Sequence, residues 1–306
     1  MEINGIHHIS AICGDPQANI DFYAGVLGLR LVKVTVNYDD PGSYHLYYGD
    51  RLGTPGSAMT FFPWVGAPAG KVGSGQISAV AFSIPKGSEG FWAARIPSAT
   101  PFERDGQNGL SFVDNEGLPL ELIAASDERE AWAEYGIGAD KAIRGFHSAT
   151  ADAGRPEHSI ALLTRMGFSS RKLGDRVRFE IAGGGPAKTF DLITSNEKGY
   201  SGTGTVHHIA FGTPNDSTQE ACSAELVKAA QHPTPVQERQ FFRSIYYREP
   251  SGVLYEIATD GPGFTEDEAE PELATKLSLP SWFERVRPQI ENGLPKLTTP
   301  AGIVLP

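Results

Sequence analysis

A pair of adjacent histidines set in a short apolar stretch occurs twice in this chain, and that repeat constrains the fold more than any other feature. The first copy is Ile6-His7-His8-Ile9, and the second, Val206-His207-His208-Ile209, stands 200 residues later. Short apolar runs bounded by glycine are typical of buried strands. Two copies so far apart predict a repeated unit whose first and last members meet at one site.

Two weaker copies of this opening strand lie between the histidine pairs. When the four opening strands are aligned on the second histidine, one column of the alignment contains His8, Ala79, Ser148 and His208. Each opening is followed by a helical pattern and then by strand-like runs. In the first unit, Asp15 and Pro16 form a helix start, and the strand-like runs are residues 30–36 and 44–48. The sequence therefore predicts an α+β fold of four βαβββ units, paired into two domains of curved mixed sheets.

The places where the repeats end predict the domain boundaries. We expect an N-terminal domain of two units at residues 1–125 and a linker or helix at 126–143. A C-terminal domain of two units follows at 144–262, and residues 263–306 form an acidic, proline-rich tail.

Charge and composition exclude several classes of function. The formal net charge of −11 disfavours nucleic acid and anionic membranes, which attract basic surfaces. There is no apolar run of membrane-helix length and no signal-peptide pattern at the start, so we expect a cytoplasmic protein. Two cysteines are too few for a disulfide framework or a cysteine-based zinc site.

The histidine pairs and one later glutamate predict a metal centre. Side chains alternate between the faces of a strand, so one ring of each pair can point into a cavity. If the second ring does so, His8 and His208 face one cavity, formed by the first and fourth units. Glu256, 48 residues after His208, lies in an otherwise apolar strand, where a buried carboxylate needs a cation. Two imidazoles and one carboxylate form the facial triad of non-haem Fe(II) oxygenases.

The second and third units lack this ligand set. Ala79 and Ser148 occupy the ligand column, so we expect their cavity to hold no metal despite Glu121 and Asp191. We interpret Glu121 as a salt-bridge partner and His147 as a structural residue. We infer no function for three other histidines, because they lie in loop-like or helical settings: His45, His158 and His232.

These motifs also carry a family resemblance. The His-His-Ile openings and the Phe-Tyr-x-x-Val-Leu-Gly-Leu run at residues 22–29 resemble the vicinal-oxygen-chelate superfamily, which includes glyoxalase I, fosfomycin-resistance proteins and extradiol dioxygenases. More narrowly, residues 44–56, 144–148 and 246–256 are similar to the para-hydroquinone ring-cleaving dioxygenases, the 2,6-dichlorohydroquinone 1,2-dioxygenase group. The resemblance spans about residues 5–267 and implies the vicinal-oxygen-chelate fold.

The resemblance implies cleavage of a hydroquinone-type ring by Fe(II), with Mn(II) as the alternative metal. A small aromatic molecule and O₂ are then the partners, without nucleic acid or membrane, and a homo-oligomer is compatible with the sequence. The metal ligands implied are His8, His208 and Glu256. The pocket residues implied are His7, Ser10, His207, Arg239 and Tyr246.

Each implied pocket residue has a physical role. A neutral His7 or His207 suits acceptance of a phenolic proton near pH 7, although strand alternation turns both rings away unless a bulge intervenes. Tyr246 can donate a hydrogen bond to the bound phenolate, and Arg239 can stabilise negative charge. Ser10 is expected to contact the substrate together with Arg239 and Tyr246.

Three other functions remain open at the sequence level. A catechol-type extradiol dioxygenase commonly takes a histidine from the opening of the third unit, where Ser148 stands. A glyoxalase-like isomerase or lyase needs a fourth ligand on the remaining strand, which we place at residues 45–48, with no carboxylate before Asp50. The third alternative is a metal-free module that binds aromatic compounds, whose behaviour would not change when Fe(II) is added.

Overall fold

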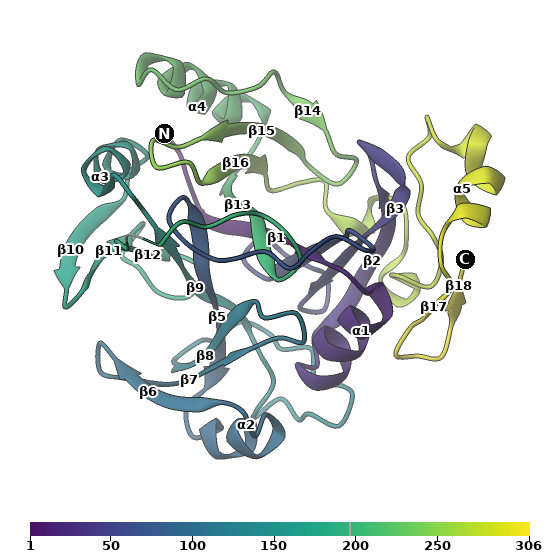
Figure 1. Cartoon of the computed structure of the whole chain (residues 1–306). Helices are drawn as coiled ribbons and strands as arrows, with labels where there is room; N and C mark the ends of the chain where they lie inside the picture. Colours follow the sequence, from purple (N-terminus) through teal and green to yellow (C-terminus); the bar gives the residue numbers. More distant parts are fainter. Residues whose placement is uncertain (196) are drawn as a thin grey trace.

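The computed structural model describes residues 1–195 and 197–306, and within them the four βαβββ units are present (Figure 1). Unit one consists of β1 (Gly5–Cys13), α1 (Pro16–Ile20), the π-helical η1 (Asp21–Val26), β2 (Arg30–Asn37), β3 (Asp40–Gly49) and β4 (Ala58–Pro63). Unit two consists of β5 (Gln76–Pro85), α2 (Glu89–Arg95), β6 (Thr100–Arg104), β7 (Gln107–Val113) and β8 (Pro119–Ala125).

The second half of the chain repeats this order. Unit three consists of β9 (Gly145–Asp152), α3 (Pro156–Arg165), β10 (Ser169–Leu173), β11 (Arg176–Glu180) and β12 (Thr189–Ile193). Unit four consists of β13 (Thr205–Thr213), α4 (Asp216–Lys228), β14 (Gln237–Glu238), β15 (Arg243–Arg248) and β16 (Leu254–Thr259). The predicted fold class is therefore confirmed.

The units pair across the middle of the chain. Within the described residues, units one and four form an eight-stranded sheet in the order β14-β15-β16-β13-β1-β4-β3-β2, which we call sheet A. Units two and three form a second sheet, sheet E, in the order β10-β11-β12-β9-β5-β8-β7-β6. The division into domains 1–125 and 144–262 stays a prediction, but each sheet draws strands from both sides of it. Residues 126–143 contain turns and loop and no helix.

One strand of unit one differs from expectation. We expected the second strand-like run at residues 44–48 and named no strand after it; instead β3 begins at Asp40, and β4 follows it. The strand β4 runs parallel to β1, just as β16 runs parallel to β13. The fourth strand, not the third, therefore lies beside the histidine strand in each unit.

The helix of unit one begins as its sequence predicts. The Asp15 carboxylate accepts hydrogen bonds from the backbone N–H groups of Gln17 and Ala18, and Pro16 takes the first helical position. Gly28, at φ +71°, follows η1 and turns the chain into β2.

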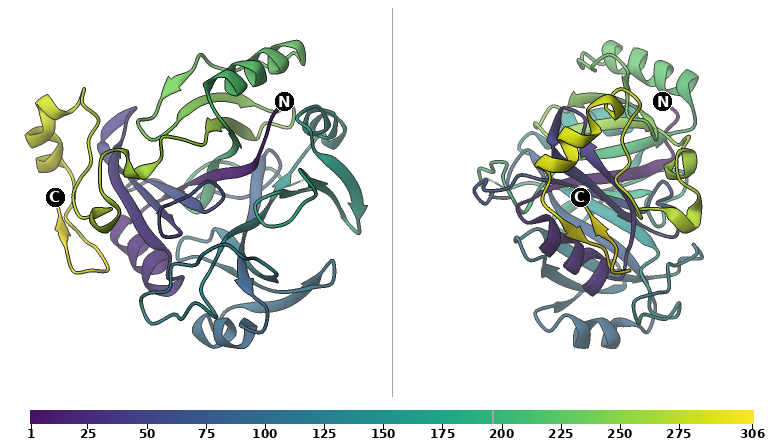
Figure 2. Two further views of the ribbon diagram at one scale, coloured as in Figure 1. Left: turned by 180° about the vertical axis from the view of Figure 1, so that it is seen from behind. Right: turned by 90° about the vertical axis from the view of Figure 1, so that its right-hand side faces the viewer.

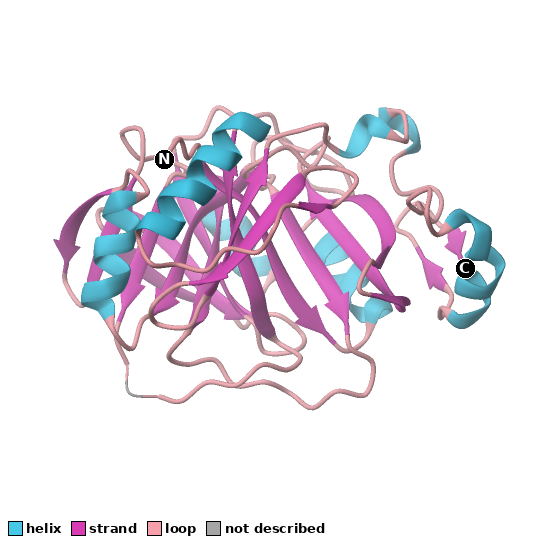
Figure 3. Ribbon diagram, turned by 90° about the horizontal axis from the view of Figure 1, so that it is seen from above, coloured by secondary structure: helices cyan, strands magenta, loops and turns pink. Residues whose placement is uncertain are grey.

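The strands form two curved sheets (Figure 3), and buried apolar side chains of both sheets make up one core. Phe211 of β13 meets Phe190 of β12 edge to face, with ring centroids 5.7 Å apart. Ile9, Ile209 and Ile257 are fully buried in the same core. Because side chains alternate, their neighbours His8, His208 and Glu256 point to the other face of sheet A.

The C-terminal segment lies along the edge of sheet A that β2 and β3 form (Figure 2). It contains η2 (Phe264–Glu266), η3 (Glu270–Glu272), η4 (Glu284–Val286), α5 (Arg287–Gly293), β17 (Leu297–Thr298) and β18 (Val304–Leu305). Lys33 of β2, fully buried, pairs with Asp267 at 2.6 Å and with the buried Glu268. No helix in the described part of the chain is long and apolar enough to cross a membrane.

Candidate metal centre

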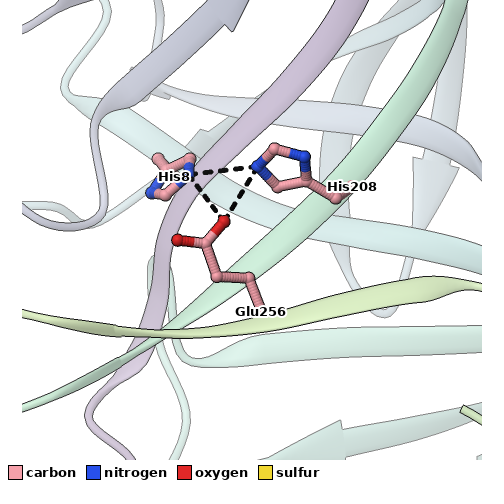
Figure 4. A group of neighbouring side chains, drawn as sticks. All are labelled: His8, His208 and Glu256. Carbon is pink, nitrogen blue, oxygen red and sulfur yellow. Dashed lines mark hydrogen bonds and ion pairs between the residues drawn. The ribbon is translucent and has the colours of Figure 1, made fainter. Parts of the chain in front are cut away.

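His8, His208 and Glu256 converge on one point of sheet A (Figure 4). The ladder between β1 and β13 sets Ser10 opposite His208, and Ala210 pairs with Glu256 in the next ladder. The two Nε2 atoms lie 3.3 Å apart, and Oε2 of Glu256 lies 3.3 Å from His8 and 2.9 Å from His208. The three side chains are buried, and the described residues contain no other such cluster of three histidine, cysteine or carboxylate ligands.

This triangle has the size of one face of a metal coordination shell. Ligand atoms about 2.1 Å from a divalent ion and at right angles to one another lie about 3.0 Å apart. The observed separations of 2.9, 3.3 and 3.3 Å match that spacing. Oε2 of Glu256 is buried without an aligned hydrogen-bond donor, as expected of an atom reserved for a cation. The three residues therefore fit a divalent metal ion.

A β-bulge in each histidine strand brings the first ring of the pair beside the second. The pairing of β1 with β13 skips a residue between Ile6 and His8, and again between His208 and Val206. His7 and His207 are the two residues left unpaired. The Nδ1 atoms lie 2.9 Å apart for His7 and His8, and 2.8 Å apart for His207 and His208. The bulge that the implied roles require is therefore present in both strands.

These contacts fix the tautomers in a metal-bound site. When Nε2 of each ligand histidine binds a metal, its Nδ1–H must donate to Nδ1 of the neighbouring ring. Burial lowers the pKa of His7 and of His207 to about 3, so both rings are neutral acceptors. The remaining proton of each then lies on its Nε2. Nε2 of His7 is buried without a partner among the described residues, whereas His207 lines the cavity.

Glu256 is held as a carboxylate. Burial would raise its pKa, but the adjacent imidazoles of His8 and His208 hold the pKa well below its usual range. Ser244 of β15 donates a hydrogen bond to Oε1, which leaves Oε2 for the metal. This division of the two oxygens orients the ligand.

The ligands open onto a cavity of about 250 Å³, a volume suited to a single-ring molecule. Phe62 and Phe242 give apolar walls, and His207, Arg239 and Tyr246 also line it. Nε of Arg239 donates to the Tyr246 hydroxyl at 3.2 Å. Burial raises the pKa of Tyr246, so the phenol remains a neutral hydrogen-bond donor.

Two of the five predicted pocket residues do not line this cavity. Ser10 is fully buried, and its hydroxyl lies 2.6 Å from that of Thr60. His7 lies behind His8, against the ring of Phe242. His7 thus contacts His8 rather than the cavity, and direct contact of Ser10 with substrate remains a prediction.

His45 was missed, and the strand for a fourth ligand was misplaced. His45 lies on β3 and lines the cavity, contrary to the loop-like setting we assigned. Ser10, two residues after His8, pairs with Thr60 of β4. In the same way Ala210, two residues after His208, pairs with Glu256 of β16. Thr60 of β4, not a residue of 45–48, therefore occupies the fourth-ligand position. No sequence signal pointed to His45, because its link to Ser10 passes through Thr60 of another strand, β4.

Sheet E repeats the carboxylate positions of sheet A, and arginines pair with the carboxylates there. Glu121 and Asp191 occupy the positions of Glu256 in units two and three. Arg104 donates to both oxygens of Glu121 at 2.7 and 2.6 Å, which confirms the predicted salt bridge. Arg178 binds both oxygens of Asp191 at 2.8 and 2.9 Å. Guanidinium groups thus neutralise both carboxylates there.

Comparisons with known proteins agree with this geometry. Residues 5–257 match the family model of the Glyoxalase/Bleomycin resistance protein/Dioxygenase superfamily. The chain is 44% identical over 298 residues to the "Putative ring-cleaving dioxygenase MhqO" of Bacillus subtilis, covering 95% of each chain. It is 33% identical to the chlorohydroquinone/hydroquinone 1,2-dioxygenase of Sphingobium indicum, covering 94% of this chain and 95% of that one.

Solved structures extend the likeness to the fold. A Bacillus subtilis crystal structure described as a "putative dioxygenase" superposes with a TM-score of 0.94 at 43% identity, covering 97% of this chain and 98% of that one. Glyoxalase I from Zea mays superposes at 0.60 with 16% identity over 84% of this chain and 92% of that one, which shows a shared fold alone.

Proposed function

The chain belongs to the Glyoxalase/Bleomycin resistance protein/Dioxygenase superfamily, and from that premise we propose that it is a ring-cleaving dioxygenase acting on hydroquinone-type substrates. Two observations support the reaction class: the relatives carry dioxygenase names, and the ligand set is that of non-haem iron oxygenases. We propose Fe(II) as the metal, with Mn(II) as the alternative, and O₂ as the second substrate.

The observation that carries the proposal is the triangle formed by His8, His208 and Glu256 at the floor of a small aromatic-walled cavity. Three ligands on one face leave other coordination positions for substrate and O₂. Bound Fe(II) would supply the redox chemistry between them. The protein holds both reactants in one place, which removes most of the entropic cost of their encounter.

The cavity residues bind and orient the substrate. Phe62 and Phe242 flank the ring, while Tyr246 and Arg239 donate hydrogen bonds to oxygen atoms that gain negative charge. The tautomer argued above puts a proton on Nε2 of His207, so we propose that this atom is a donor to the substrate rather than the expected proton acceptor. His7 is a positioning residue that fixes the ring of His8 through Nδ1.

The fourth-ligand position weighs against the isomerase alternative. Thr60 lacks a carboxylate, and its hydroxyl is engaged by Ser10 and His45 at 2.6 and 2.9 Å. A three-residue ligand set favours a reaction that needs open coordination positions.

The test is O₂ consumption by protein loaded anaerobically with Fe(II), given hydroquinone, methylhydroquinone and catechol in parallel. We expect uptake with the two hydroquinones and none with a His208→Ala variant. Uptake with catechol alone would assign a catechol-type extradiol enzyme instead. No uptake by protein that carries one bound iron per chain would refute the dioxygenase proposal, and parallel loading with Mn(II) identifies the metal.

A further inference from the structure

A row of four hydrogen-bonded side chains runs from β1 across β4 and β3 of sheet A, two strands that carry no metal ligand. The Ser10 hydroxyl lies 2.6 Å from Thr60 Oγ1, which lies 2.9 Å from Nε2 of His45. Nδ1 of His45 lies 2.7 Å from the Tyr47 hydroxyl. The row therefore runs outward from β1 through β4 to β3, and its outer members, His45 and Tyr47, line the cavity.

The strands that carry the outer part of this row, β4 and β3 of unit one, correspond to β16 and β15 of unit four, where Glu256 lies. Tyr47 pairs with Thr60 on β4, as Tyr246 pairs with Glu256 on β16. His45 lies two residues before Tyr47, as Ser244 lies two residues before Tyr246, and Ser244 bonds to Glu256 as His45 bonds to Thr60. The cavity thus has two tyrosines in equivalent places, one on the ligand side and one opposite.

The donor in each hydrogen bond of the row follows from the residue at its inner end, Ser10. Among the described residues, Thr60 is the one side-chain partner of the buried Ser10 hydroxyl, so Ser10 must donate to Thr60. Thr60 then donates to Nε2 of His45, which leaves the ring proton on Nδ1 to be donated to the Tyr47 oxygen. The hydroxyl proton of Tyr47 is left free for an acceptor in the cavity, and the aligned row strengthens it as a donor.

The distance of Tyr47 from the ligands decides which oxygen it can reach. Tyr246 pairs directly with the ligand Glu256 on the adjacent strand β16. Tyr47 pairs instead with Thr60 of β4, which is not a ligand, and the nearest strand that carries a ligand on its side is β1, two strands or about 10 Å away at the usual strand spacing. A ring with oxygens at opposite ends spans such a gap, whereas the two oxygens of a catechol both stay near the metal.

We propose that Tyr47 binds the hydroxyl para to the oxygen held at the metal centre, and so selects 1,4-diols over 1,2-diols. Thr60 and His45 are positioning residues that keep the Tyr47 hydroxyl a donor. The assignment rests on the proposed function, since it names the group that recognises the far end of the hydroquinone.

The test is anaerobic calorimetric titration of Fe(II)-loaded protein with hydroquinone and with phenol, which lacks the far hydroxyl. Tyr47→Phe is expected to weaken hydroquinone binding about three- to tenfold, the range for one hydrogen bond, and to leave phenol binding unchanged. Tyr246→Phe is the matched control from the equivalent strand, and should weaken both ligands by the same factor.

Equal effects of Tyr47→Phe on the two ligands, or no effect on either, would overturn the assignment while leaving the dioxygenase proposal in place. Failure of the wild-type protein to bind hydroquinone would refute the proposed function, and this assignment with it.

The positioning role has its own readout. Nitrogen NMR of ¹⁵N-histidine-labelled, metal-free protein should find His45 protonated on Nδ1, and Thr60→Val should shift the proton to Nε2. The same variant should weaken hydroquinone binding as Tyr47→Phe does. A wild-type His45 protonated on Nε2 would overturn the direction of the row.

Discussion

Replacing Arg178 by methionine should destabilise the protein strongly, although this residue lies in the sheet without the metal site. Arg178 binds both oxygens of Asp191, and their side chains are 3% and 0% exposed. Methionine keeps most of the apolar stem, so the change mainly removes the charge. Asp191 is then left as a buried carboxylate without its principal partner.

The size of the loss in the free energy of unfolding depends on the contacts that remain around Asp191. Removing one partner of a buried ion pair costs about 3–5 kcal/mol. Arg176 remains 3.4 Å from Oδ2 of Asp191 and is itself mostly buried, so part of the charge stays compensated. We therefore expect the low end, about 3 kcal/mol, in the free energy of unfolding.

Urea unfolding followed by circular dichroism measures this loss. The matched control is Arg171→Met, because Arg171 is 44% exposed and pairs with the partly exposed Asp105. Exposed pairs contribute little, so that variant should change the unfolding free energy by less than about 1 kcal/mol. Adding Asp191→Leu to Arg178→Met should recover most of the loss, because no buried charge then remains.

Equal losses in the two single variants, or a double variant no more stable than Arg178→Met, would refute the reasoning. Either result would mean that Arg178 does not compensate a costly buried charge. The view that guanidinium groups neutralise the carboxylates that correspond to Glu256 would be refuted as well.

Three further predictions concern the metal centre and sheet E. Glu256→Gln should abolish the binding of one iron per chain, measured by elemental analysis after desalting, because an amide cannot supply the anionic ligand. His7→Leu should weaken metal affinity about 10- to 100-fold in competition with a chelator, because His8 loses the acceptor that orients it; unchanged affinity would contradict this role. Burial lowers the pKa of His147 from 6.5 to about 4, so the folded state binds fewer protons and its stability, full above pH 6.5, falls as the pH drops to 4. Between pH 7.5 and 4.5, the free energy of unfolding measured in urea should therefore fall by about 2.5 kcal/mol less for His147→Gln than for the wild type. Equal falls in the two proteins would exclude His147 as the cause.

Local signals were enough to predict the repeat and the metal ligands. The histidine pairs mark β1 and β13 directly, and Glu256 stands out as a charge within an apolar strand. Strand alternation then lets only one ring of each pair point inward, and we took it to be the second, His8 in the first pair. The positions of these residues depend on strand identity alone, and sequence patterns carry that information.

The missing parts depend on contacts between strands. The strand β4 reads Ala-Met-Thr-Phe-Phe-Pro, a short apolar run without polar alternation, and its omission moved the fourth-ligand position to the wrong strand. His45 acquires its place only through Thr60 and Tyr47, once β3 and β4 pair. The pairing of Asp191 with Arg178 likewise joins neighbouring strands whose register the sequence leaves open.

The strand order of sheet A also has a consequence for synthesis on the ribosome. The strand β1 is made first, yet its antiparallel partner β13 follows some 200 residues later. At about 5–20 residues per second, the nascent strand waits about 10–40 s with one edge unpaired. Sheet E is built from the contiguous residues 76–193 and can close during that interval. A nascent chain that has left the ribosome only as far as residue 204 would therefore present one finished sheet and one exposed, apolar strand edge, which is the form of this chain most exposed to aggregation and most in need of a chaperone.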